Sequence, residues 1–223
     1  MVELIALPDA ARVRENLARV HEEIARAARA AGREPDAVRV LAATKYVACA
    51  DLPELAHAGV TLVGENRAPD LQEKAAAHAA LFEWHFIGQL QSRRVRAIVP
   101  HVRLIHSVAS ESALHELARH REHARPGLEL LLQVNVAREP GKAGIAPEQL
   151  ADLLERAPLP VVGLMTMPPL AADPDASRQW FAALRELAAA HGLAQLSMGT
   201  SQDYPAAVAE GATIVRIGAS LYA

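Results

Sequence analysis

Lysine is scarce in this chain, so each of its lysines is a candidate for amine chemistry. The 223 residues carry 23 basic side chains, of which 20 are arginine and three are lysine: Lys45, Lys74 and Lys142. Lys45 follows directly on the apolar run 40–44. A lysine directed into an apolar barrel mouth loses hydration, which favours the neutral, nucleophilic amine. The alternative for Lys45 is a strand-end lysine whose ammonium group reaches out to water.

The other two lysines admit less specific explanations. For Lys74 we favour a general compositional preference for arginine, with no chemistry attached to the lysine that remains. Lys142 lies in the glycine-containing stretch 139–144, where it is either a surface charge or a second amine near the site. Of the three, Lys45 is the residue whose position predicts a reactive amine.

Two stretches near the end of the sequence could bind an anion. Residues 197–201 contain hydroxyl side chains and a glycine, and they precede a short helix predicted around 205–210. The hydroxyls and the free backbone N–H groups could hold a phosphate at the positive end of that helix. Arg216 and Gly218 offer a cation and a close approach of the backbone. Together with a buried lysine, these groups indicate a phosphorylated aldehyde as ligand.

Alternating apolar and amphipathic segments must position these residues. The first segment is a predicted helix with Asp9 as its N-cap and Gly32 after its end. Eight strands are predicted to follow, at 38–45, 61–66, 84–88, 104–108, 129–135, 161–167, 195–200 and 213–220. Helices are predicted between them, with start signals at 51–54 and 146–148 and a helix over 175–191.

Strands that alternate with helices imply parallel strands joined by crossovers. Eight such units predict an α/β protein, a (β/α)₈ TIM barrel with an extra N-terminal helix, formed by one domain over residues 1–223. A doubly wound open sheet is the alternative, but no G-x-G-x-x-G motif follows the first strand.

The active face of such a barrel is the C-terminal rim of its strands. That rule selects Lys45, 65–66, 85–91, 106–107, Asn135, 165–167, 197–201 and 216–220. His85 and His106 are explained by structural hydrogen bonds at least as readily as by catalysis.

Composition and charge exclude several classes of function. The net charge is −3 with no run of like charge, so neither nucleic acid nor an anionic membrane is a predicted partner. The single cysteine, Cys49, cannot form an intrachain disulfide, and no Cys/His spacing resembles a metal site. The N-terminus does not resemble a secretory signal, and no apolar run approaches the roughly 18–20 residues that span a bilayer. We therefore expect a cytoplasmic protein.

Several segments, in order over nearly the whole chain, resemble the pyridoxal phosphate homeostasis protein family. They are 40–45, 64–67, 84–92, 105–108, 133–135, 142–145, 163–167, 196–201 and 215–218. This family is related to the N-terminal barrel domain of alanine racemase, so the resemblance implies the same barrel. Residues 68–70 depart from the family pattern, which leaves the open side of the pocket undefined.

The resemblance implies pyridoxal 5′-phosphate (PLP) as the cofactor, carried as a Schiff base on Lys45. It further implies that Arg216 faces the pyridine nitrogen, and an arginine there would keep this nitrogen unprotonated and the ring a poor electron sink. The remaining implied contacts are Ser201 and the backbone of Gly218 and Ala219 for the phosphate, Asn66 near the ring, and Met198 packed against it.

Three functions are compatible with these residues. The first is a PLP carrier in intracellular PLP homeostasis with no catalytic residue, because the predicted barrel takes up the sequence and leaves no second domain to supply the tyrosine that racemases need. The second is a low-activity racemase or decarboxylase with Tyr46, His85 or Lys142 as second base. The third is a PLP-free aldolase acting on a sugar phosphate. PLP-dependent apoenzymes are candidate recipients of the cofactor, and we expect a monomer.

Overall fold

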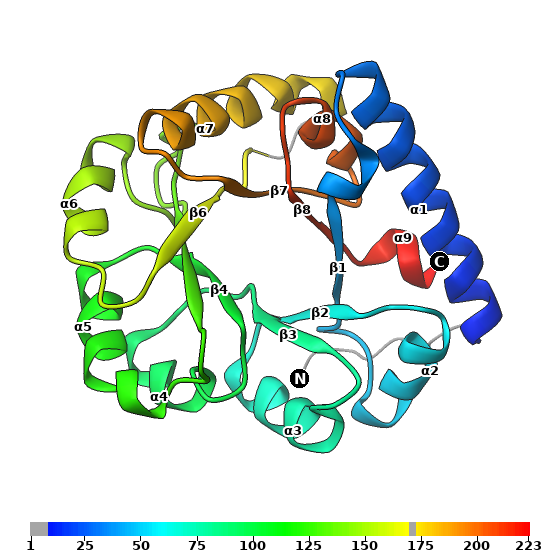
Figure 1. Ribbon diagram of the computed structural model, residues 1–223, viewed down its shortest axis with the longest axis horizontal. Helices are drawn as coiled ribbons and strands as arrows, with labels where there is room; N and C mark the ends of the chain where they lie inside the picture. Colours follow the sequence, from blue (N-terminus) through cyan, green and yellow to red (C-terminus); the bar gives the residue numbers. More distant parts are fainter. Residues whose placement is uncertain (1–8, 170–172) are drawn as a thin grey trace.

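Eight parallel strands close into a barrel in the order β1 to β8, with β8 pairing back onto β1 (Figure 1). The computed structural model describes residues 9–169 and 173–223. The strands are β1 Arg39–Ala43, β2 Leu62–Glu65, β3 Glu83–Phe86, β4 Leu104–Val108, β5 Glu129–Gln133, β6 Val161–Met165, β7 Gln195–Thr200 and β8 Ile214–Ile217. The predicted (β/α)₈ barrel is therefore confirmed.

Helices surround the barrel on its outside (Figure 1). They are α1 Ala10–Ala30, α2 Leu52–His57, α3 Ala68–His78, α4 Val95–Ile98, α5 Glu111–Arg119, α6 Leu150–Glu155, α7 Arg178–Ala190, α8 Tyr204–Ala209 and α9 Ala219–Tyr222. Short 3₁₀ turns are η1 Pro35–Ala37, η2 Cys49–Asp51, η3 Ser92–Arg94, η4 Arg121–His123, η5 Pro147–Gln149 and η6 Pro174–Ser177.

The N-terminal helix has the predicted caps. The backbone N–H of Arg12 donates to Asp9 Oδ1 at 2.8 Å, and Gly32 has φ 68° after the helix ends. The expected helix over 175–191 begins instead as the 3₁₀ turn η6, and α7 starts at Arg178. The expected last strand over 213–220 is wrong beyond Ile217, because residues from Ala219 onward turn into α9.

Side chains of each strand alternate between two apolar layers, which decides where the polar residues point. One small cluster fills the barrel and contains Leu41, Leu62, Leu104, Leu131, Met165 and Ile214. A larger cluster lies between the strands and the helices, and on β8 it contains Val215 and Ile217. Arg216, between these two, therefore points into the barrel.

Helix α1 fastens the end of the chain against the barrel. It packs beside α8 and α9 (Figure 1). Asn16 Nδ2 donates to the backbone oxygens of Leu221 and Ala223, at 3.0 Å each, and the Tyr204 hydroxyl donates to Glu23 at 2.5 Å. These contacts fix the β8–α9 connection, where Gly218 lies. No helix in the ranges 9–169 and 173–223 is long and apolar enough to cross a membrane.

Candidate cofactor site at the barrel mouth

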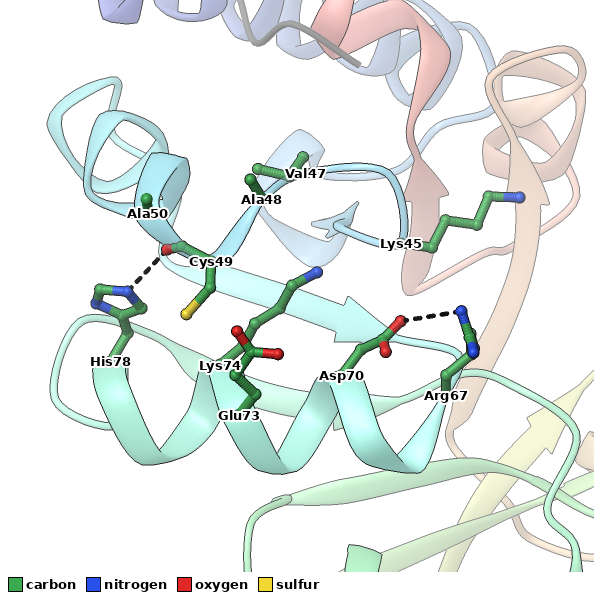
Figure 2. Close-up of a pocket in the computed structure, with 10 residues that line it drawn as sticks. All are labelled: Lys45, Val47, Ala48, Cys49, Ala50, Arg67, Asp70, Glu73, Lys74 and His78. Carbon is green, nitrogen blue, oxygen red and sulfur yellow. Dashed lines mark hydrogen bonds and ion pairs between the residues drawn. The ribbon is translucent and has the colours of Figure 1, made fainter. Parts of the chain in front are cut away.

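Lys45 lies on the C-terminal rim, two residues past the end of β1. Its Nζ stands 4.5 Å from the centroid of the Tyr46 ring, and among the described residues it has no hydrogen-bond or ion-pair partner. A cavity of about 680 Å³ begins beside it, between the β1–α2 connection and α3. Figure 2 shows that the Lys45 side chain extends away from the other residues that line this cavity, such as Cys49 and Lys74. The amine is therefore free to meet a ligand on the side of the barrel mouth.

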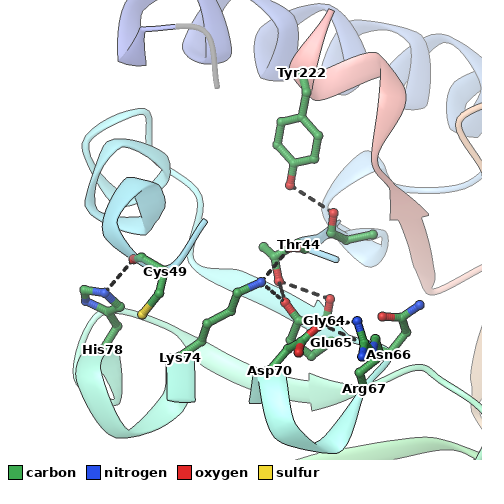
Figure 3. Close-up of polar contacts among 11 residues, drawn as sticks. Thr44, Cys49, Gly64, Glu65, Asn66, Arg67, Asp70, Lys74, His78 and Tyr222 are labelled. Atoms are coloured by element: carbon green, nitrogen blue, oxygen red, sulfur yellow. Dashed lines mark hydrogen bonds and ion pairs between the residues drawn. The ribbon is translucent and has the colours of Figure 1, made fainter. Parts of the chain in front are cut away.

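The backbone in front of Lys45 is held in place on several sides (Figure 3). The Thr44 N–H donates to Gly64 O at 3.0 Å, and the Thr44 carbonyl accepts from Lys74 Nζ at 2.9 Å. The Tyr222 hydroxyl donates to Ala43 O at 3.2 Å. Because these bonds come from β2, α3 and α9, the position of Lys45 depends on three separate parts of the fold.

Lys74 forms a buried ion pair that the sequence interpretation missed. Its Nζ lies 2.5 Å from Glu65 Oε1, and the two side chains are 6% and 0% exposed. The Thr44 hydroxyl donates to the same oxygen at 2.8 Å. The signal was available in the sequence, because Lys74 lies three residues after Leu71 and one before Ala75, on the buried face of α3. Lys74 therefore has a structural role that a general preference for arginine does not describe, and the expectation that it carries no amine chemistry stays a prediction.

Arg216 is a buried cation without a carboxylate partner in the described part of the chain. It is 6% exposed, and its guanidinium donates to Ser197 Oγ at 2.6 Å, Thr166 O at 3.0 Å and Met167 Sδ at 2.8 Å. Burial lowers the pKa of Arg216 to about 10, against the opposing effect of Asp203. A guanidinium held only by neutral groups can still donate to an acceptor on a ligand.

The loops after β7 and β8 meet at one hydroxyl. The backbone N–H groups of Gly218 and Ser220 lie 3.1 and 3.4 Å from Ser201 Oγ. A Cβ atom on Gly218 would come no nearer than 3.7 Å to protein atoms, all of them on Ala43. The two N–H groups and the hydroxyl form an edge suited to an oxyanion, with Ala219 between them in the chain.

Asn66 follows β2 on the same rim. Its Oδ1 is buried and has no hydrogen-bond partner within the described residues. Gly88, after β3, packs so closely on the Asn66 backbone that a Cβ there would lie 1.9 Å from Asn66 O. The backbone of Asn66 is therefore fixed while its side-chain oxygen keeps a lone pair for a donor group.

Met198 does not lie at the mouth, contrary to what the resemblance implies. It is 0% exposed and belongs to the outer apolar layer with the α8 residues Ala207 and Val208. Alternation along β7 sends Ser197 inward and Met198 outward. Any contact of Met198 with a ring at the mouth would have to cross the strand.

Three further candidates are already engaged within the protein. Lys142 Nζ donates to Glu139 Oε2 at 2.8 Å and to Pro168 O at 2.9 Å. Asn135 exchanges hydrogen bonds with the backbone of Glu139 at 2.9 and 3.1 Å, which closes the β5 loop. His85 is 1% exposed, inside the barrel. The structural explanation for His85 therefore fits its surroundings.

Three candidate groups lie on the elements β1, β7 and β8, which are neighbours in the barrel. They are an amine on Lys45, a buried guanidinium on Arg216, and the edge around Ser201 that is suited to an oxyanion. This arrangement defines a class: α/β barrels that pair a strand-end lysine with an anion site on the same rim. Such a site can hold a phosphorylated carbonyl compound and react with it through the amine. No cluster of potential metal ligands occurs in residues 9–169 and 173–223.

Comparison with known proteins gives the family. The family described as alanine racemase, N-terminal domain, matches residues 9–223. A pyridoxal phosphate homeostasis protein of Pseudomonas aeruginosa is 42% identical over 94% of this chain and 94% of its own length. One from Aquifex aeolicus is 38% identical over 93% and 96%. This chain belongs to the pyridoxal phosphate homeostasis protein family.

A solved structure carries the same barrel. PipY of Synechococcus elongatus, solved with PLP bound, superposes with a TM-score of 0.79 at 32% identity, over 95% of this chain and 100% of that one. The barrel and its relation to the alanine racemase N-terminal domain are therefore established for this chain.

Proposed function

We propose that this protein binds PLP through Lys45 and serves PLP homeostasis, with little or no turnover. The observation that carries the proposal is the Lys45 amine, which has no hydrogen-bond or ion-pair partner among the described residues. It lies on the rim that also presents Arg216 and the Ser201 edge, in a chain 42% identical to a protein of that name. When bound, PLP supplies an aldehyde that reacts reversibly with amines. The barrel mouth fits PLP because the aldehyde, the pyridine nitrogen and the phosphate of PLP each have a candidate partner there.

The residues divide by what they would hold. Lys45 offers the amine, and Arg216 offers remaining N–H groups for the pyridine nitrogen. Ser201 and the backbone of Gly218 and Ala219 would hold the phosphate. Asn66 offers an unpartnered buried oxygen near the ring. Met198 would act only from the outer layer, by fixing β7.

The residues around Lys45 favour a carrier over an enzyme. A racemase or decarboxylase needs a second acid–base group at the ring, and the three candidates were Tyr46, His85 and Lys142. Lys142 is bound to Glu139 and Pro168, and His85 is enclosed in the barrel. Tyr46 is 39% exposed and places its ring beside the Lys45 ammonium. Lys45 and Tyr46 would therefore approach a substrate from the same side. A low-activity racemase or decarboxylase is the alternative that a turnover assay would detect.

We further propose that residues 1–223 form one barrel domain and that the protein is a monomer. We also propose that it acts in the cytoplasm and that PLP-dependent apoenzymes receive the cofactor. Closure of β8 onto β1 supports the monomer because the sheet has no free edge to pair with a second chain. Light scattering on the eluting protein measures the oligomeric state, and a dimer at low micromolar concentration would contradict this part.

Borohydride reduction tests the central proposal. We expect purified protein with PLP to absorb in the visible, and reduction to fix a pyridoxyl group on the peptide that contains Lys45. Lys45→Ala should abolish the modification, while Lys142→Ala, a matched change on the same rim, should leave it. A colourless protein, or modification that persists in Lys45→Ala, would refute the assignment. Release of product from an amino acid, above the rate with free PLP, would favour the enzyme.

A further inference from the structure

A continuous series of hydrogen bonds crosses the barrel interior from Arg216 to Glu83. Arg216 Nη1 lies 2.6 Å from Ser197 Oγ, and that oxygen lies 2.8 Å from His106 Nδ1. His106 Nε2 lies 2.9 Å from His85 Nδ1, and His85 Nε2 lies 2.7 Å from Glu83 Oε1. We call these five residues the interior relay. It joins the candidate site to the first residue of β3, at the opposite end of the barrel.

The two ends of the relay fix the direction of every bond. A guanidinium can only donate and a carboxylate can only accept. Glu83 is a carboxylate, because the hydrogen bond from His85, helped by Arg39 at 3.1 Å, lowers its pKa to about 2. His85 must therefore carry its proton on Nε2.

The inner members follow by elimination. Burial is the main cause that lowers the pKa of both histidines, which are 1% and 0% exposed, so each is neutral with one N–H. His85 Nδ1 then accepts from His106 Nε2–H, and His106 Nδ1 accepts from the Ser197 hydroxyl. Ser197 Oγ is left to accept from Arg216.

Among the described residues, Asp203 also acts on Arg216 through its charge, but no hydrogen bond joins the two side chains. The charged groups that act on the histidines are Arg39, Arg103 and Arg216, together with Glu83 itself. The barrel interior also contains the apolar cluster with Leu41, Leu62 and Leu104. Glu83 is thus the carboxylate to which Arg216 is connected, although the two make no direct contact.

We propose that Glu83, His85 and His106 are positioning residues, which orient the Ser197 hydroxyl and through it Arg216 at the cofactor nitrogen. This role rests on the proposed function. With Nη1 committed to Ser197 and Nη2 to Thr166 O, the guanidinium plane is fixed on one side. The fixed plane determines where its remaining N–H groups point. Removal of the carboxylate removes the constraint on all four bonds at once.

The test compares two glutamates with the same place in the fold. Glu83→Gln replaces an acceptor-only group by an amide that can also donate. Glu129→Gln is the matched control, since Glu129 is the first residue of β5 and pairs with Arg103 at 3.4 Å, outside the relay. Ser197→Ala cuts the relay at its other end and serves as a second variant.

Nitrogen NMR of the imidazoles in the PLP-free protein measures which ring nitrogen of each relay histidine carries the proton. In wild type and Glu129→Gln we expect both histidines as single Nε2–H tautomers at pH 7. In Glu83→Gln we expect the second tautomer to appear at His85. A mixture of tautomers in wild type would overturn the proposed direction.

Absorption of added PLP then tests the positioning role. We expect Glu83→Gln and Ser197→Ala to retain PLP about tenfold less tightly and with a shifted visible band, and Glu129→Gln to match wild type. If wild type binds PLP but both relay variants retain it like the control, the positioning role is refuted and the proposed function stands. If wild type fails to bind PLP at all, the proposed function itself fails.

Discussion

Replacement of Lys74 by methionine removes the cation from a buried ion pair and leaves the carboxylate. In wild type the Lys74 ammonium contacts both Glu65 Oε1, at 2.5 Å, and the Thr44 carbonyl, at 2.9 Å. Methionine fills a similar volume, so packing between α3 and the barrel changes little. Among the described residues, Glu65, which is 0% exposed, then keeps its contacts with Thr44 and with the Asn66 N–H. The perturbation is therefore an uncompensated buried charge beside the residue that precedes Lys45.

The magnitude follows from the burial of the pair. Loss of one partner from a buried ion pair costs about 3–5 kcal/mol. In a domain of this size, 1 kcal/mol corresponds to a change of about 2–4 °C in Tm. We therefore expect Lys74→Met to lower Tm by about 6–20 °C. The double variant Lys74→Met/Glu65→Gln should recover more than half of this loss, because no charge is then left buried.

Urea denaturation followed by circular dichroism measures these free energies of unfolding. Arg138→Met is the control, since it breaks an ion pair with Glu148 whose side chains are 63% and 62% exposed. Such a pair contributes little to stability, because water and salt screen the two exposed charges. A loss in Lys74→Met no larger than that in Arg138→Met would refute the reasoning. If the double variant does not recover stability, packing and not the buried charge causes the loss of stability in Lys74→Met.

Three further predictions concern the mouth and the relay. Gly218→Ala should change Tm by less than about 2 °C, because the added Cβ would lie 3.7 Å from Ala43 Cβ and φ is −125°. The same change should weaken PLP retention, and unchanged retention by absorbance would place the phosphate elsewhere. Arg216→Ala should weaken PLP retention and shift its spectrum, and an unchanged titration would remove the arginine from the ring. The pKa values of His85 and His106 are lowered in the folded protein. The unfolded chain therefore binds protons below pH 6.5 that the folded chain does not, and the free energy of unfolding should fall by up to about 2.7 kcal/mol per pH unit below pH 6. A urea series from pH 7 to 5 that shows a flat response would contradict neutral histidines.

The barrel could be predicted from the sequence because most of its strands are apolar or β-branched runs between turn residues. Strands β4 and β7 coincide with their predicted ranges. The errors lie at the rim, where backbone leaves the ladder. Residues 218–220 are small enough to extend a strand by pattern, but the chain turns into α9 beside Ser201. Local pattern cannot show that turn, because contacts with a separate loop decide it.

The candidate site could be predicted where strand order and the alternation of side chains along a strand determine a residue's position. Lys45 and Arg216 follow from those rules. Met198 was expected at the ring, but the alternation of side chains along β7 directs it outward. The Lys74–Glu65 pair and the relay were harder to find. Each joins side chains from different elements, and a histidine at position 85 or 106 gives no sign in the sequence of which partner it meets.

Closure of the barrel brings together the two halves of the mouth. Strands β1 and β8 pair through Leu41 and Arg216, which come from opposite ends of the described chain. Pairing of such distant segments must overcome the entropy of closing a long loop, which pairing of consecutive strands does not. Lys45 and Gly218 therefore become neighbours only when β8 pairs with β1. Appearance of the visible band on refolding in the presence of PLP would then time the closing of the barrel rather than the growth of its helices.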